Sequence, residues 1–455
     1  MAPRASLDRR DFLKSAGITA FVGSAGVRTA TAHSGGVLAY EPPDGKYDFD
    51  TVYNRIGTDC TKWDRQIRLY GAGSIAVGMG IADMDFRAAP AITKALQDRL
   101  AHENWGYLDM PQSFIASIVS WNKRRYGVEI DPNTLVIAAG VHPALIAAIQ
   151  TFSPPGSKVL MQAPAYDGFY SDLRFARVKA EESPLRLVDG RYSMDFDDLE
   201  RRISHDTNTM ILCNPQNPTG NCWSAEDLTR LGEICLRRRV VVLADEIHCD
   251  FVSKGHKYTP FASLPNKAIV DNSITFKAAS KSFGLAAHKI GWFYSTNPDL
   301  LARVRANHRA DLSTLGVVAN RAAYEGGEEW LNQLVAYIDA NHDFVQQYVR
   351  DNMPLVKYRK AEGTYLAWLD VSAVCDRIGA AGLAEAANKT RNASTAVLTP
   401  ENMVERHFVS HAKVHMNPGS AYGLGGHGRM RMNIATSRKL LELALNNLAT
   451  ALRKT

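Results

Sequence analysis

Short apolar runs recur through the middle of this chain, and they restrict its fold more than any other feature of the sequence. Val240–Ala244 consists only of Val, Leu and Ala. A strand of that composition is apolar on both faces, as in a parallel sheet that helices cover on each side. Five further runs favour strands: Thr134–Ala139, Lys158–Gln162, Thr209–Cys213, Ser273–Phe276 and Ile290–Tyr294. We therefore expect an α/β fold.

Helical patterns separate several of these runs, and a unit of different character follows them. Ser224 and Asp227 form a capping motif that predicts the start of a helix. Long helices are expected at residues 224–239, 328–353 and 438–453, the last with Ser437 as its cap. Strands are expected at Gly363–Asp370 and Ala412–Asn417. The chain is long enough for two domains, and the second should be a smaller α+β unit.

Three polar side chains come close behind three of the apolar runs. They are the amide of Asn217, the carboxylate of Asp245 and the amine of Lys281. Ligands of parallel sheets bind beyond the carboxyl ends of the strands, so these groups should lie near one another. Together they are what a protein needs to hold a pyridine ring and to form an imine with its aldehyde. They indicate pyridoxal phosphate, a cofactor that supplies an electron sink and leaves binding and orientation to the protein.

Each of the three has an expected role and an ordinary alternative. Lys281 would form the imine and move protons once the substrate displaces it, although most lysines are surface charges. Asp245 would keep the pyridine nitrogen protonated, or it would only cap the next segment. Asn217 would bond to the phenolic oxygen of the cofactor, although Asn-Pro-Thr-Gly is also a strong turn signal.

Two aromatic side chains would complete the pocket around the ring. Tyr166 would stack on the ring face, and His248 would reach the phenolic oxygen or the substrate. A residue of the core is the alternative for Tyr166, and a satisfied structural histidine is the alternative for His248.

Further residues suit the two anionic groups of the cofactor and the substrate. Val141 and His142 precede a helical segment, and backbone N–H groups at a helix N-terminus suit a phosphate. Ser280 and Lys289 would add phosphate contacts. Arg431 would clamp a substrate carboxylate through two parallel hydrogen bonds, an exposed salt bridge being the alternative.

From about Asp48 to Leu452 the chain resembles the fold-type I pyridoxal-phosphate enzymes, the aspartate aminotransferase superfamily. Within it, the chain is most similar to the MalY/PatB type of cystathionine β-lyase. Segments of that type are residues 54–59, Lys62-Trp63-Asp64, and residues 82–86, 325–331 and 417–423. The resemblance implies a large domain at residues 77–325 with a mostly parallel seven-stranded sheet between helices. It also implies a small domain at residues 326–455, which residues 33–76 join.

The same resemblance implies an activity, an assembly and residue roles. The activity is carbon–sulfur β-lysis of cystathionine, cystine or another cysteine S-conjugate to a thiol, pyruvate and ammonia. The assembly is a homodimer whose active sites lie at the subunit interface, where Tyr107 reaches the phosphate of the neighbouring cofactor. Lys281 would be the Schiff-base lysine, Asp245 the pyridine partner and Arg431 the carboxylate anchor.

Some positions depart from the lyase type. Gly80-Ile81 stands where those enzymes have a Trp-Val pair, and Gly284 stands where they have Asn. Gly284-Leu285 is typical of ordinary aminotransferases, whose phosphate-binding arginine corresponds to Lys289. An aminotransferase therefore remains the alternative reaction. A protein that binds the cofactor or a partner without catalysis is a third hypothesis, which the complete set of site residues disfavours.

Residues 1–32 resemble a twin-arginine export signal. Arg9-Arg10 precedes a mildly apolar run at Ser15–Val27, and Ala30-Thr31-Ala32 fits a cleavage site. A short helix with two chance arginines is the alternative. The signal predicts passage through the twin-arginine translocase and a periplasmic or secreted protein.

The charge, the hydropathy and the cysteine spacing of the chain argue against a nucleic-acid partner, a transmembrane helix and a metal site. The net charge is only +6, and Arg237-Arg238-Arg239 is the longest basic tract, so no nucleic-acid partner is expected. No apolar stretch is long enough for a transmembrane helix. The cysteines and histidines lack zinc spacing, so no metal is expected.

Overall fold

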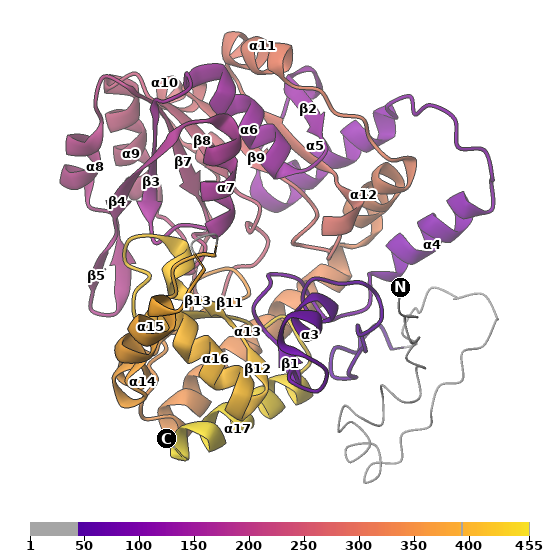
Figure 1. Ribbon diagram of the computed structural model, residues 1–455. Helices are drawn as coiled ribbons and strands as arrows, with labels where there is room; N and C mark the ends of the chain where they lie inside the picture. The colour runs from indigo at the N-terminus through magenta and orange to yellow at the C-terminus, as the bar shows by residue number, and fades with distance from the viewer. Residues whose placement is uncertain (1–43, 393–394, 455) are drawn as a thin grey trace, which may run out of the picture.

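A seven-stranded sheet forms the centre of the upper part of the molecule (Figure 1). The computed structural model describes residues 44–392 and 395–454, so the predicted export signal lies outside the described residues. The strands, in spatial order, are β2 (Leu135–Ala138), β10 (Gly291–Tyr294), β9 (Ser273–Lys277), β8 (Val241–Asp245), β7 (Thr207–Cys213), β3 (Lys158–Ala163) and β4 (Lys179–Pro184). Pairing is parallel from β4 to β9, and β10 is antiparallel to both of its neighbours. The predicted α/β fold with a mostly parallel sheet is confirmed.

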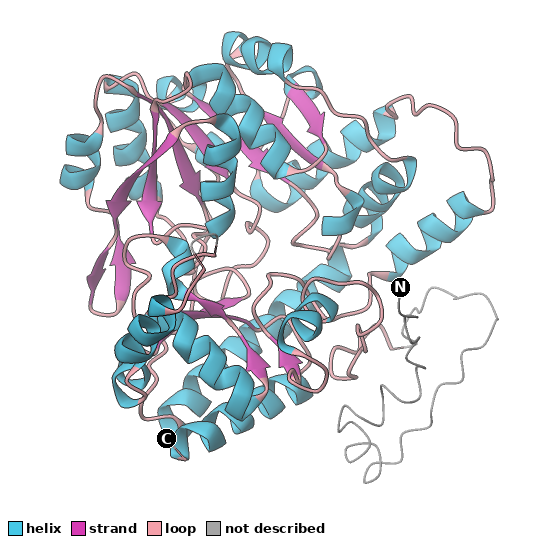
Figure 2. Ribbon diagram, in the orientation of Figure 1, coloured by secondary structure: helices cyan, strands magenta, loops and turns pink. Residues whose placement is uncertain are grey.

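Helices cover both faces of this sheet (Figure 2). Leu243 packs into one apolar cluster, while Val242 and Ala244 pack into the other. The alternation explains the uninterrupted apolar run of β8, because both of its faces are buried. The first cluster includes α6 (Val141–Phe152), α7 (Asp167–Ala176) and α11 (Pro298–Asn307). The second includes α8 (Phe196–Arg202), α9 (Ala225–Arg237) and α10 (Lys267–Asp271).

A smaller α+β unit lies below the sheet in Figure 1. Its three-stranded antiparallel sheet has the order β11 (Leu366–Asp370), β14 (Arg429–Asn433) and β13 (Asn417–Pro418). A second small sheet pairs β1 (Val77–Gly78) with β12 (Val414–His415). The unit also contains α13 (Glu328–Asn352), α14 (Ser372–Arg377), α15 (Ala380–Lys389), α16 (Pro400–Ala412) and α17 (Arg438–Arg453).

The single strand expected at residues 412–417 is wrong. The segment forms two short strands, β12 and β13, which belong to different sheets. Met416, between them, is buried, so the chain stays apolar while it changes its pairing partner. The long helices are confirmed: Ser224 caps α9 with a reciprocal capping box, and Ser437 caps α17. The predicted domain boundaries stay a prediction.

The N-terminal elements and the connection between the two units complete the fold. α3 (Asp64–Tyr70), α4 (Pro90–Leu100) and α5 (Gln112–Tyr126) precede β2, and α12 (Thr314–Gly326) precedes α13. The hairpin of β5 (Arg186–Val188) with β6 (Arg191–Ser193) follows β4. Within residues 44–392 and 395–454, no helix combines the length and the apolar character needed to cross a membrane.

Candidate active site

Asn217, Asp245 and Lys281 lie at the carboxyl ends of three adjacent strands. Asp245 ends β8, Asn217 follows β7, and Lys281 follows β9 by four residues. These three strands are mutually parallel, so their carboxyl ends share one edge of the sheet. The edge faces the smaller unit (Figure 2), and the expected meeting of the three groups is therefore observed.

Asp245 is a buried carboxylate with an unusual proton affinity. Its Oδ1 accepts a hydrogen bond from the backbone N–H of Ile247 at 3.1 Å. Burial nevertheless raises the pKa of Asp245 to about 6, against the opposing effects of that hydrogen bond and of His142 and Lys281. A carboxylate in such a place gains from a cationic partner, and the protonated nitrogen of a pyridine ring fits this need.

Lys281 presents its amine to the same space. Its Nζ donates to the carbonyl oxygen of Ala82 at 3.0 Å. Burial and the nearby guanidinium of Arg431 lower the pKa of Lys281 to about 8. A large fraction of the amine is therefore neutral near pH 8, as a nucleophile or a general base requires.

Arg431 comes from β14 of the smaller unit and crosses to the sheet edge. Its Nη1 donates to Asn217 Oδ1 at 3.1 Å, and its Nη2 donates to the carbonyl oxygen of Gly80 at 2.9 Å. The guanidinium also lies over the ring of Tyr422. Because both contacts fix its plane, Arg431 is prepared to receive a carboxylate. The site therefore lies at the junction of the two units.

Two buried nitrogen atoms in this region lack a hydrogen-bond partner among the described residues: His248 Nδ1 and Arg431 Nε. Burial lowers the pKa of His248 far below its ordinary value, so its ring is neutral and can accept or donate one bond. Buried polar atoms are normally paired. Two unpaired nitrogens near Lys281 therefore fit a site that takes a polar ligand such as a hydroxypyridine with a phosphate.

The start of α6 forms the next wall of the site. Gly140 precedes Val141 in a backbone conformation of φ 116°. His142 Nδ1 lies 2.7 Å from Asp172, and this pairing raises the pKa of His142. The His142 and Tyr166 rings lie 5.7 Å apart. An imidazole that this pairing makes easier to protonate, beside the first amides of α6, suits a phosphate group.

Three predicted residues are placed at the margin or outside. Tyr107 is fully exposed on the loop between α4 and α5, which extends away from the body in Figure 1. Lys289 is exposed, with a left-handed φ of 53°. Ser280 is half-buried beside Lys281. Among the described residues, Tyr107 and Lys289 form no hydrogen bond or ion pair with the rest of the site.

Two contributors were not foreseen. Tyr365 donates to the same Ala82 carbonyl as Lys281, at 3.1 Å, and its ring lies against His248. Asp172 fixes the ring of His142. Both residues lie far in sequence from their partners, and no local pattern pointed to either of them.

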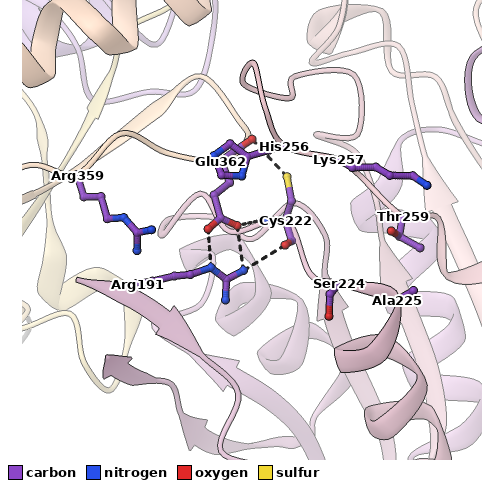
Figure 3. A pocket seen from close by; sticks show the side chains of 9 residues that line it. All are labelled: Arg191, Cys222, Ser224, Ala225, His256, Lys257, Thr259, Arg359 and Glu362. Carbon is purple, nitrogen blue, oxygen red and sulfur yellow. Dashed lines mark hydrogen bonds and ion pairs between the residues drawn. The ribbon is translucent and has the colours of Figure 1, made fainter. Parts of the chain in front are cut away.

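The loop after Asn217 is tied to the smaller unit beside a cavity of about 490 Å³ (Figure 3). Glu362 accepts two bonds from Arg191, at 2.5 and 3.0 Å, and one from the backbone N–H of Cys222 at 3.1 Å. Arg191 belongs to the β5–β6 hairpin and Glu362 precedes β11. This bridge holds the hairpin, the Asn217 loop and the smaller unit together.

Known proteins are similar in sequence to this chain over nearly its whole described length. Cystathionine beta-lyase PatB of Bacillus subtilis (strain 168) is 37% identical over 412 residues, which are 89% of this chain and 100% of that protein. Protein MalY of Escherichia coli (strain K12) is 29% identical over 414 residues, 90% of this chain and 99% of that protein.

Solved structures share the fold. The PLP-bound C-S lyase from Staphylococcus hominis has a TM-score of 0.79 and 28% identity, covering 90% of this chain and 100% of that one. Cystalysin from Treponema denticola, which contains pyridoxal 5′-phosphate, has a TM-score of 0.80 and 27% identity, covering 90% and 99%. The pattern described as Aminotransferase class I and II matches residues 74–448, and with these similarities it shows that the chain belongs to that family.

Proposed function

We propose that the protein binds pyridoxal 5′-phosphate and is a carbon–sulfur β-lyase. It cleaves cystathionine, cystine or a related cysteine S-conjugate to a thiol, pyruvate and ammonia. The convergence of Asn217, Asp245, Lys281 and Arg431 at one sheet edge carries this proposal. Relatives that are named as lyases support the reaction type, because they are similar to 89% or more of this chain.

The residues present fit the cofactor. When bound, pyridoxal phosphate supplies the electron sink for a carbanion. Asp245 would stabilise a protonated pyridine nitrogen, and Asn217 and His248 are the candidates for the phenolic oxygen. Tyr166 would lie against the ring. The phosphate would be held by Val141, His142 and Ser280, and Lys289 would reach it from the exposed rim of the site.

The chain's own groups perform the proton transfers. Arg431 holds the substrate carboxylate, with Asn217 fixing its guanidinium. The Lys281 amine would remove the α-proton of the substrate, and its lowered pKa keeps a useful fraction of it unprotonated. The bond between the β-carbon and sulfur then breaks, and the thiolate leaves with the electron pair and takes up a proton. Water hydrolyses the remaining unsaturated amine to pyruvate and ammonia.

An aminotransferase is the second candidate. It is favoured by the family pattern and by Gly284-Leu285 after Phe283, where Gly284 has a φ of 68°. In that reaction Lys281 moves the proton onward and no carbon–sulfur bond breaks. The substrate then leaves as a keto acid, and a second keto acid is needed to restore the enzyme.

A substrate panel separates the two reactions. Cystathionine, cystine and S-alkylcysteines are incubated with the holoenzyme, with and without a keto-acid acceptor, and pyruvate and thiol are measured. The lyase forms both products without the acceptor, whereas strict dependence on the acceptor makes the protein an aminotransferase. Lys281→Ala should lose product formation and the visible absorbance of the lysine-bound cofactor together.

The active unit is a homodimer in which Tyr107 contacts the cofactor phosphate of the neighbouring subunit. The complete exposure of Tyr107 and the half-exposed Trp105 on the projecting loop support this assembly. Sedimentation should give twice the chain mass, and Tyr107→Phe should weaken cofactor binding without changing that mass. A fully active monomer contradicts the assembly.

Residues 1–32 act as a twin-arginine export signal, so the mature protein is periplasmic or secreted and its export partner is the twin-arginine translocase. Arg9-Arg10, the apolar run and the Ala30-Thr31-Ala32 segment support it. Replacing both arginines with lysine should retain the protein in the cytoplasm. Equal export of the double variant and the parent contradicts the signal.

A further inference from the structure

A second buried carboxylate, Asp250, is bonded to Ser282, the residue that follows Lys281. Only 7% of Asp250 is exposed. Its Oδ2 accepts from Ser282 Oγ, and its Oδ1 accepts from the hydroxyl of Tyr126 and from Arg125 Nε, the last at 3.0 Å. Ser282 follows Lys281 directly and is itself 1% exposed. Asp250 therefore holds the turn that carries the amine.

The same carboxylate also stands close to the other half of the site. Asp250 follows Asp245 by five residues and His248 by two. The backbone N–H of Phe251 donates to the carbonyl oxygen of His248 at 3.0 Å, which closes this segment into a turn. One side chain thus joins the turn after β8 to the turn after β9.

The groups that face Asp250 from α5 and β9 are also fixed. The hydroxyl oxygen of Tyr126 accepts a hydrogen bond from the Cys249 thiol at 3.3 Å. Lys277, 4% exposed, lies 3.8 Å above the Tyr126 ring and donates to Asn122 Oδ1 at 3.0 Å. These neighbours leave Asp250 little room to move.

Arg125 extends the network to α13, the helix that leads into the smaller unit. Arg125 Nη1 lies 3.4 Å from Glu328 and donates to Asn332 Oδ1 at 2.8 Å. Glu328, the first residue of α13, also pairs with Arg124 at 3.0 Å. The position of Asp250 is therefore set in part by the start of α13, a helix of the smaller unit.

We propose that Asp250 is a positioning residue for Lys281. Through Ser282 it fixes the turn that carries the amine, and through Arg125 it fixes the position of that turn relative to α13. The inference rests on the proposed function, because it takes Lys281 as the reacting amine. A displacement of about 1 Å at a reacting group can reduce its rate about a hundredfold, so a dedicated anchor at the neighbouring residue has a large effect.

The test compares Asp250→Asn and Ser282→Ala with the parent holoenzyme. Ser282→Ala removes one hydroxyl, and Asp250 keeps its bonds to Arg125 and Tyr126. This second variant still tests the proposal if Asp250→Asn folds poorly. Two quantities are measured without substrate. They are the midpoint of the pH titration of the lysine-bound cofactor absorbance, and the rate at which that absorbance returns when cofactor is removed and added again.

Both variants should slow the return of the absorbance about tenfold or more and displace the titration midpoint. Asp339→Asn is the matched control, because Asp339 is also a mostly buried carboxylate, paired with Lys360 at 2.8 Å and with the backbone N–H of Lys254. If neither quantity changes more than in Asp339→Asn, the positioning role is overturned. A failure of the lyase assay with these spectral changes intact would instead count against the proposed reaction.

Discussion

At the scale of single residues, Asp245 is buried and Lys281 is partly buried, although each is ordinarily charged at neutral pH. Burial raises the pKa of Asp245 and lowers that of Lys281, so the fold disfavours both charges. Both residues could be predicted because each follows an apolar strand. Asp172 and Tyr365 could not, because their importance arises from partners that are distant in sequence.

Asp245→Asn should therefore stabilise the cofactor-free protein while removing activity. The folded pKa of Asp245, about 6, exceeds the ordinary 3.8, so the folded state binds more protons between these values and loses stability as the pH rises through this window. At about 1.4 kcal/mol per unit, the variant should gain up to about 3 kcal/mol at pH 8.

Thermal unfolding of both proteins without cofactor, at pH 8 and at pH 4, checks this expectation. Most of the advantage of the variant should disappear near pH 4, where the carboxyl group of the parent is protonated in the folded state and partly protonated in the unfolded state. A parent that is the more stable protein at pH 8 would count against the cost assigned to the buried charge.

At the scale of elements, apolar runs located six strands of the large sheet, whereas β4 was missed. Its sequence, Lys179–Pro184, is polar, because β4 is an edge strand with much of its surface exposed. Its strand character comes from pairing with β3, which no local pattern reports. The split between β12 and β13 was missed for a similar reason, since only the pairing partners distinguish the two strands.

The close packing of β10 against the start of α6 gives a prediction at this scale. A Cβ at Gly291 would lie 2.7 Å from the carbonyl carbon of Gly140 and 2.9 Å from the nitrogen of Val141. Gly291→Ala should therefore push the proposed phosphate-binding turn aside and cost about 1–3 kcal/mol of stability.

Cofactor affinity, followed by absorbance, should fall about tenfold or more in Gly291→Ala. Gly382→Ala is the control, because an added Cβ there meets no atom within 4 Å. Unchanged cofactor affinity in Gly291→Ala would show that the turn does not hold the phosphate.

At the scale of the whole molecule, the site depends on how the two units meet. Asn217 lies in the loop that follows β7 of the large sheet, and Arg431 lies in β14 of the small one. The order of the site residues could be read from the sequence, but not the carbonyl oxygens of Gly80 and Ala82, which bond to Arg431 and Lys281. Every residue carries a carbonyl group, so only the packing of the units identifies these two.

The ion pair of Arg191 with Glu362 should help to hold the two units together. Arg191→Ala is expected to lower the free energy of unfolding by about 1 kcal/mol, since a third of the Arg191 side chain is exposed and screened. It should also raise the KM several-fold, because the Asn217 loop loses an anchor. Arg186→Ala is the control: Arg186 lies on the same hairpin but pairs with Asp195. Equal kinetic effects of the two variants would argue against a role for the bridge.

The central claim, cleavage of a carbon–sulfur bond, is tested most directly by counting products per active site. The holoenzyme is mixed with excess cystathionine without any keto acid, and pyruvate, thiol and ammonia are measured over many minutes. The proposed lyase should release all three in equal amounts and far beyond one equivalent per Lys281. A yield that stops at one equivalent of keto acid per site, with no thiol, would contradict the account and identify an aminotransferase.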